Sequence, residues 1–176
     1  MIREVWSVYP REGVGPLRFG MTHAEVAKFD HVMGPLDETT EETLRSGQVV
    51  RNEFRGSGAP LCSFQNGRLS YISISQFDPI DFRFEDVSVF DDDLKRVYST
   101  LGRAAGAAYW HIFSVVMPSL CVELVGFVME YSNKEEPPIF ESSKGGFTWP
   151  TLIMYSPDFP PFDDKKFIEI SNQAAG

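Results

Sequence analysis

The chain has 176 residues, of which 43% are hydrophobic and 14% aromatic, a composition that excludes a disordered protein and allows one domain with a sizeable core. Its formal net charge of −9 argues against direct nucleic-acid binding and favours a partner with a basic surface. No window approaches the roughly 18 consecutive apolar residues of a membrane span, and the first residues lack the apolar run of a secretory signal, so we expect a cytoplasmic protein that does not enter a membrane.

A helix is predicted over residues 22–33. Thr22 and Glu25 have the spacing of a capping box, and apolar residues follow at helical spacing. Gly34 is the expected left-handed stop. Each residue of the preceding Gly-Met-Thr junction, 20–22, has a structural role in this interpretation, so the junction is a helix start and not a reaction centre.

Strands are predicted on both sides of this helix. Residues 3–10 form a short run rich in Val and aromatic side chains, and residues 48–54 alternate like a strand. The segment 37–47 is polar and acidic, and it predicts a loop or one weak helical turn. Two strand-like runs within 61–75 flank the Asn-Gly pair 66–67, which is typical of a two-residue type I′ hairpin.

A second helix is predicted from Asp91 to Gly102. Asp91 is its expected cap, with Asp92 and Asp93 in the first turn, where the helix dipole favours negative charge. Strand-like sequence follows this helix, and the segment 167–171 adds a predicted edge strand.

The order of helix and then β-rich sequence occurs twice, which predicts an α+β fold. We expect two pseudo-repeated lobes, each a helix packed on an antiparallel sheet, within the single domain 1–176. The boundaries expected for these lobes are 1–80 and 81–176.

The sequence contains no recognisable catalytic, cofactor-binding or metal-binding motif. His23 and His31 are two helical turns apart, which is too far for a shared metal ion. The acidic run 91–93 is interpreted as helix capping and solvated charge and not as a cation site. Cys62 and Cys121 lack metal-ligand spacing, and we interpret them as buried small hydrophobes of a reducing compartment, although a disulfide between them stays open.

The remaining functional signal is acidic residues beside aromatic ones, the pattern of protein interfaces with an aromatic anchor and a charged rim. The alternative that these rings belong to the core stays open. The predicted partner-binding residues are Asp91, Asp92, Asp93, Trp110, Glu135, Glu136, Phe147 and Trp149.

Two segments also resemble known bacterial families. The sequence LRFGMTHAEV, residues 17–26, resembles the helix start of the outer-membrane-assembly lipoproteins of the SmpA/OmlA type and of the β-lactamase-inhibitor proteins, which contain two tandem α/β lobes. The sequence VSVFDDDLKRVYSTL, residues 87–101, is similar to the second-half helix start of many immunity proteins encoded beside polymorphic toxins. The resemblance implies two lobes and an immunity role.

From these observations we expect a cytoplasmic immunity or inhibitor protein, not an enzyme. It would bind and occlude a bacterial effector toxin with a basic surface, such as a nuclease. Two alternatives are a carboxylate- or metal-dependent hydrolase with a dispersed site and an envelope-assembly scaffold module.

Overall fold

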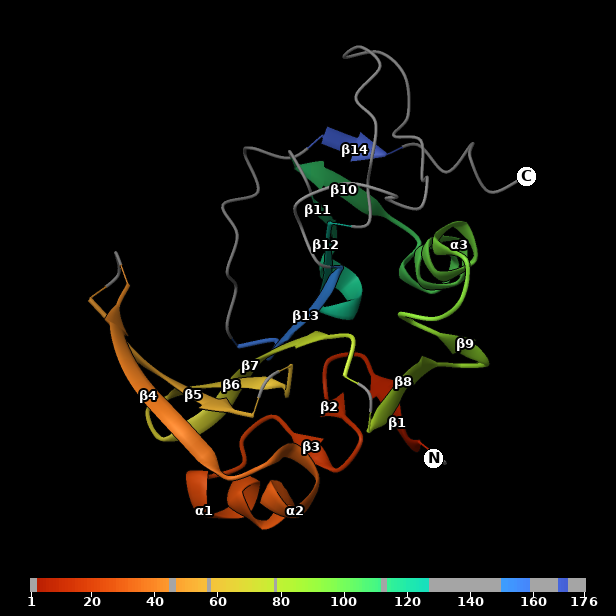
Figure 1. Ribbon diagram of the computed structural model, residues 1–176. Coiled ribbons are helices and arrows are strands. Elements are labelled where there is room, and N and C mark those ends of the chain that lie inside the picture. The colour runs from red at the N-terminus through yellow and green to blue at the C-terminus, as the bar shows by residue number, and fades with distance from the viewer. Residues whose placement is uncertain are drawn as a thin grey trace.

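Strands make up most of the fold, which is α+β (Figure 1). The computed structural model describes residues 3–44, 47–56, 58–77, 79–111, 114–126, 150–158 and 168–170. Among these, a five-stranded sheet has the order β3-β2-β1-β8-β9 and a nine-stranded sheet the order β14-β10-β11-β12-β13-β7-β6-β5-β4. None of the helices in the described part is both long and apolar enough to cross a membrane.

The smaller sheet consists of β1 (Glu4–Tyr9), β2 (Gly13–Val14), β3 (Leu17–Arg18), β8 (Ile80–Phe84) and β9 (Val87–Ser88). Its central strands β1 and β8 are parallel, with Trp6 opposite Phe82. The strand predicted over residues 3–10 is therefore confirmed, but its pairing with a strand more than 70 residues later has no local signal in the sequence.

The larger sheet is antiparallel at every junction. Its strands are β14 (Ile168–Ile170), β10 (Ala108–His111), β11 (Ser114–Met117), β12 (Val122–Val125), β13 (Thr151–Tyr155), β7 (Arg68–Ser75), β6 (Leu61–Gln65), β5 (Val49–Arg55) and β4 (Leu36–Thr43). At its centre β7 pairs with β13, so this sheet combines strands from both halves of the chain.

The predicted first helix is confirmed in place and in its cap. It consists of α1 (His23–Val26), a 3-10 turn (Ala27–Phe29) and α2 (Asp30–Met33). The Thr22 N–H donates to the Glu25 carboxylate at 2.7 Å, and the Glu25 N–H donates to the Thr22 hydroxyl, which completes the capping box. The preceding junction is pinned to β7, because the Gly20 N–H donates to the Leu69 carbonyl at 2.8 Å.

The bounds predicted for the second helix are wrong. Helix α3 spans Leu94–Ala105 and ends at Gly106 with a φ of 75°, beyond the predicted stop. Its cap is Asp93, whose carboxylate accepts from the Lys95 N–H at 3.0 Å. Asp91 does not cap the helix because its carboxylate is engaged by Arg3.

The loop predicted over residues 37–47 is also wrong, because β4 occupies most of it. β4 pairs with β5 from Leu36 to Thr43, and tertiary pairing overrides its polar composition. The strand predicted over residues 48–54 is confirmed as β5, Val49–Arg55, and two further local predictions are confirmed as well. Asn66 and Gly67, with φ values of 52° and 72°, join β6 to β7, and β14 forms an edge strand.

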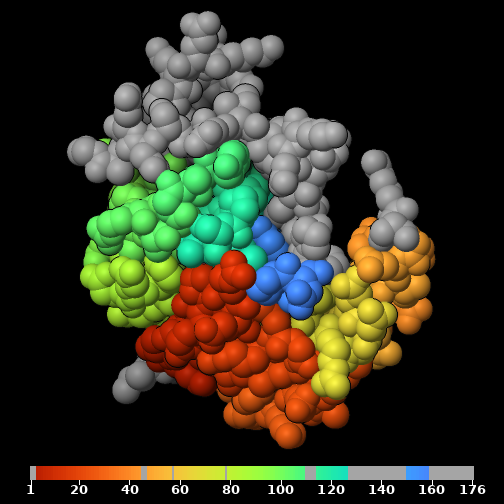
Figure 2. All heavy atoms as spheres, turned by 180° about the vertical axis from the view of Figure 1, so that it is seen from behind, coloured from red at the N-terminus to blue at the C-terminus, as the bar shows by residue number. Residues whose placement is uncertain are grey.

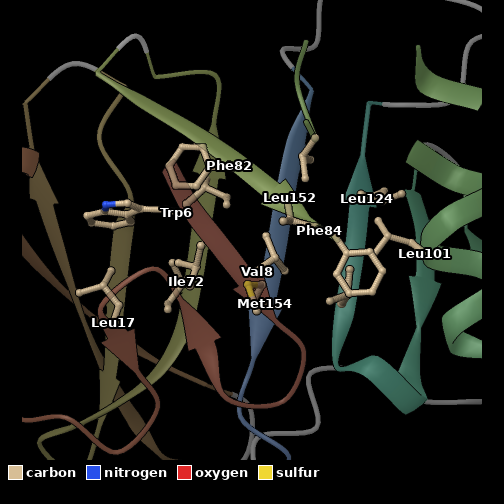
Figure 3. Packing of buried hydrophobic residues seen from close by; sticks show 14 of the residues in the cluster. Trp6, Val8, Leu17, Ile72, Phe82, Phe84, Leu101, Leu124, Leu152 and Met154 are labelled. Carbon is tan, nitrogen blue, oxygen red and sulfur yellow. The ribbon is translucent and has the colours of Figure 1, made fainter. Parts of the chain in front are cut away.

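One buried cluster fills the space between the two sheets (Figure 3). Trp6 of β1 and Phe82 of β8 meet edge to face at a ring separation of 6.1 Å and lie over the larger sheet. Ile72 of β7 and Met154 of β13 form part of the opposite wall. Helix α3 extends the same core with Leu101, so both sheets and this helix share one core and not separate ones.

Two glycines of similar backbone conformation should differ in their tolerance of alanine. Gly15 and Gly20 both have left-handed φ values, of 52° and 86°, but a Cβ at Gly15 would lie 2.4 Å from the ring of buried Trp6, whereas a Cβ at Gly20 meets nothing within 4 Å. We expect Gly20→Ala to cost about 1 kcal/mol and Gly15→Ala at least about 2 kcal/mol more, measured by urea denaturation. Equal losses would show that Trp6 does not need Gly15.

Candidate protein-binding surface

The β4–β5 hairpin carries the most exposed mixture of acidic and apolar side chains in the described residues. Seven of the eight β4 side chains are exposed. Among the large hydrophobic residues that the structure describes, five are exposed, and three of these belong to this hairpin. We call the set the acidic hairpin surface; it comprises Leu36, Asp37, Glu38, Glu41, Glu42, Val49 and Phe54.

The register of the hairpin places acid next to apolar side chains. Glu38 lies opposite Phe54, which is 38% exposed, so carboxylate and ring share one face of the sheet. Val49, 52% exposed, lies on the other face opposite Thr43. Figure 2 shows this hairpin, in orange, at the rim of the molecule. An apolar contact area with an acidic border is available on both faces of the hairpin.

A buried charge network holds the base of this hairpin. Glu53 and Arg55 lie on the core side of β5, with side chains only 2% and 1% exposed, and they pair at 2.9 Å. Arg55 also donates to the Asp30 carboxylate of α2 at 2.8 Å, and His23 of α1 contacts Glu53 at 2.6 Å. Arg51 completes the network at 3.5 Å from Glu53. The network therefore ties β5 to both parts of the first helix.

The side chain of His23 is held in place by contacts with other side chains of the fold. Its ring stacks on Phe64 of β6, with ring centres 3.9 Å apart, while its Nδ1 contacts the Glu53 carboxylate. The neighbouring thiol of Cys62 is not a ready nucleophile, because burial raises its pKa to about 12 and keeps it protonated near neutral pH. This arrangement can orient a helix on a sheet; it does not supply an activated thiolate.

The buried network was not predicted, although the sequence contains a signal for it. Arg51, Glu53 and Arg55 alternate along a strand-like segment, which places three charges on one face of the sheet. His23, the residue directly after the predicted cap Thr22, was the available partner.

The structure places the acidic residues 91–93 in contacts with their own chain. Asp91 pairs with Arg3, Asp92 accepts from the Ser88 N–H at 2.7 Å, and Asp93 caps α3. Asp92 also pairs with Arg96 at 2.9 Å. A role of these three carboxylates in partner binding stays a prediction.

The other predicted contact residues are not brought together in the described part. Trp110 belongs to β10, where its backbone pairs with β11 and β14. Glu135, Glu136, Phe147 and Trp149 lie outside the described residues. Their role in partner binding therefore stays a prediction.

Neither a disulfide nor a metal cluster is found in the described residues. Cys62 and Cys121 are both free and buried, as expected for small hydrophobes. In the same parts of the chain, no group of three or more His, Cys, Asp or Glu side chains is placed to hold a metal ion.

An open groove of about 400 Å³ lies on a different part of the surface, where the β6–β7 turn approaches the end of β13. Arg11 and Arg68 line it together with Asp158. Each guanidinium donates to a backbone carbonyl, Arg11 to Ser119 and Arg68 to Gly20. With two cations and an acid in an open depression, the groove does not define one ligand class.

Comparison of the chain with family models, curated proteins and solved structures gives no match. The function is therefore argued from the chemistry of this molecule's own surface.

Breaking the buried network should destabilise the fold. Because Glu53 and Arg55 are both buried, we expect Glu53→Leu and Arg55→Met each to cost up to about 3–5 kcal/mol, since each change leaves the remaining buried charge with fewer partners. The double variant should lose several kcal/mol less than the sum. The exposed control Glu42→Leu should stay within about 0.5 kcal/mol in urea denaturation. Strictly additive losses would argue against a coupled pair.

Alkaline pH should also destabilise the fold, through the buried thiol of Cys62 and the half-buried phenol of Tyr71. Burial raises the pKa of Cys62 from 9.0 to about 12, and burial together with the Glu123 carboxylate raises that of Tyr71 from 10.0 to about 12. Above pH ~9 the unfolded chain loses these protons first, so the free energy of unfolding falls as pH rises towards 12, by up to about 1.4 kcal/mol per pH unit for each group. Below pH ~8 neither group contributes a slope.

Denaturation at several pH values checks this expectation. Tyr71→Phe should flatten the alkaline slope, whereas Tyr9→Phe, at a 41% exposed position, should leave it unchanged. An identical slope in both variants would contradict the assignment to Tyr71.

Proposed function

We propose that this protein is a cytoplasmic immunity or inhibitor protein that binds a bacterial effector toxin and occludes its working surface. The target has a basic surface, as a nuclease does. The acidic hairpin surface is the observation that carries this proposal, because it combines exposed apolar side chains with four carboxylates on one protruding hairpin. Interfaces commonly use this combination of apolar anchors and a charged rim.

The charge of the whole chain supports a basic target. A formal net charge of −9 gives the protein a negative field that raises its encounter rate with a positively charged surface. The β4 carboxylates are exposed, so their interactions with a partner are screened by salt. Binding should therefore weaken as the salt concentration rises.

The buried network supports tight binding. An inhibitor gains affinity when its binding surface is already ordered, because less conformational entropy is lost on association. Glu53 and Arg55 fix β5 to the first helix. These contacts fix the position of β5 and therefore of the hairpin that carries the acidic hairpin surface.

We also propose that the chain consists of two pseudo-repeated lobes, as in tandem-lobe inhibitors. The order of elements supports this, since α1–α2 precedes the meander β4–β7 and α3 precedes the meander β10–β13. The last strands of the two meanders, β7 and β13, then join the lobes in one sheet.

The proposal predicts a salt-sensitive one-to-one complex with the toxin domain encoded beside this gene. We expect the wild-type protein to bind it and to protect cells, with weaker binding at 300 mM than at 50 mM NaCl by isothermal calorimetry. Glu38→Gln/Glu41→Gln/Glu42→Gln should lower the affinity at least tenfold, because it removes three carboxylates from the acidic hairpin surface.

The matched control is Glu12→Gln/Glu85→Gln/Asp158→Asn, which removes the same charge from exposed positions elsewhere. It should stay within about threefold of wild type, since long-range steering alone is a small effect at this salt. Absence of a complex and of protection at low salt would disprove the proposed function.

A further inference from the structure

Strand β4 is an uncovered edge of the larger sheet. Of the four strands that end a sheet in the described residues, β3 and β9 have two residues each and β14 has three, whereas β4 has eight. All β4 side chains except that of Thr40 are exposed, and within the described ranges of the chain no further strand pairs with this edge. Long exposed edges present unpaired backbone groups that can bind another strand.

The register shows which backbone groups face outward. The Leu44 N–H donates to the Gln48 carbonyl at 2.8 Å, and the same register continues along β4 and β5. Hydrogen-bonded and non-hydrogen-bonded pairs alternate in an antiparallel ladder, so the even-numbered residues 38–42 bond to β5. Thr39, Glu41 and Thr43 therefore direct their N–H and C=O groups away from β5, towards the free edge.

We propose that β4 binds an extended basic segment of a partner protein as an additional strand of the sheet. Three outward N–H donors and three outward C=O acceptors on alternate residues match the backbone of such a segment. The inference rests on the proposed function only for the identity of the natural partner. Binding of an extended basic peptide to β4 needs no toxin.

The side chains select a basic segment. Glu38 and Glu42 lie on one face of the sheet and Glu41 on the other, so an added strand meets carboxylates on both of its faces. Lysine or arginine at these positions pairs with them across the strands. Phe54 lies on β5, on the far side of β4 from an added strand, so only a long side chain such as lysine or arginine reaches its ring.

A second copy of this chain is a poor occupant of the same edge. Two β4 strands placed side by side would bring eight carboxylates together, since each carries Asp37, Glu38, Glu41 and Glu42. Like charges on neighbouring strands are destabilising. The acidic residues thus act against self-association and favour a basic partner.

The test uses a labelled, end-blocked eight-residue peptide that alternates lysine and valine, measured by fluorescence anisotropy at 50 mM NaCl. A peptide with four lysines followed by four valines is the matched control of equal charge. Hydrogen exchange by NMR reports the position of binding. We expect the alternating peptide to bind at least tenfold more tightly than the block peptide and to slow exchange at the Thr39, Glu41 and Thr43 amides.

Two variants at Thr39 separate the contribution of backbone pairing to peptide binding from the contribution of charge. Thr39→Pro removes an outward N–H and keeps both the acidic residues and the bonds to β5, so it should weaken peptide binding at least tenfold. Thr39→Val keeps the N–H and should bind within twofold of wild type. If Thr39→Pro fails to fold, exchange protection in the wild-type protein decides the question by itself.

The outcomes distinguish this inference from the proposed function. Equal binding of the two peptides, protection away from β4, a β4-mediated dimer, or a Thr39→Pro variant that folds and binds the alternating peptide normally would each overturn strand addition. A toxin complex formed by a protein that binds the two peptides equally would overturn strand addition and leave the inhibitor function standing. Peptide pairing on β4 without any toxin complex would overturn the inhibitor function and leave strand addition standing.

Discussion

The buried pair of Glu53 and Arg55 is the interaction on which the outer hairpin depends. Both side chains point into the core side of β5, and their exposure is 2% and 1%. A buried charge without its partner costs several kcal/mol, so β5 must keep Arg55 beside Asp30 and Glu53 beside His23. β4 buries little surface of its own and takes its position from β5. The charge network thus determines where the acidic hairpin surface is displayed.

Several elements were predictable from the sequence because the interactions that form them connect residues only a few positions apart. The capping box of Thr22 and Glu25, and the Asn66-Gly67 turn, each depend on a short stretch of backbone. The pairing of β1 with β8 depends on contacts between Trp6 and Phe82, which are 76 residues apart. No propensity or spacing rule reports such a pairing, so the two sheets were not predictable from one sequence.

Strand β4, which carries most of the acidic hairpin surface, was not predicted for a related reason. β4 lacks an alternating apolar face, because neither of its faces enters the core, and its acidic residues favoured a loop. The β-branched Thr residues at 39, 40 and 43 were a weak signal for a strand. The cap position of α3 was not predicted because Asp91, Asp92 and Asp93 are equally good caps by residue type, and only their tertiary contacts distinguish them: Asp91 contacts Arg3 and Asp92 accepts from the Ser88 N–H.

The acidic residues of β4 have two consequences that reinforce each other. Proteins commonly protect a sheet edge by making it short, as in the two-residue strands β3 and β9, or by placing charge on it. A long edge protected by carboxylates alone remains open to any strand that brings the opposite charge, because the backbone groups of Thr39, Glu41 and Thr43 are still available. Protection against self-association therefore becomes selection of a basic partner, and exposed Phe54 and Val49 on the neighbouring strand β5 supply apolar contact area that charge alone does not provide.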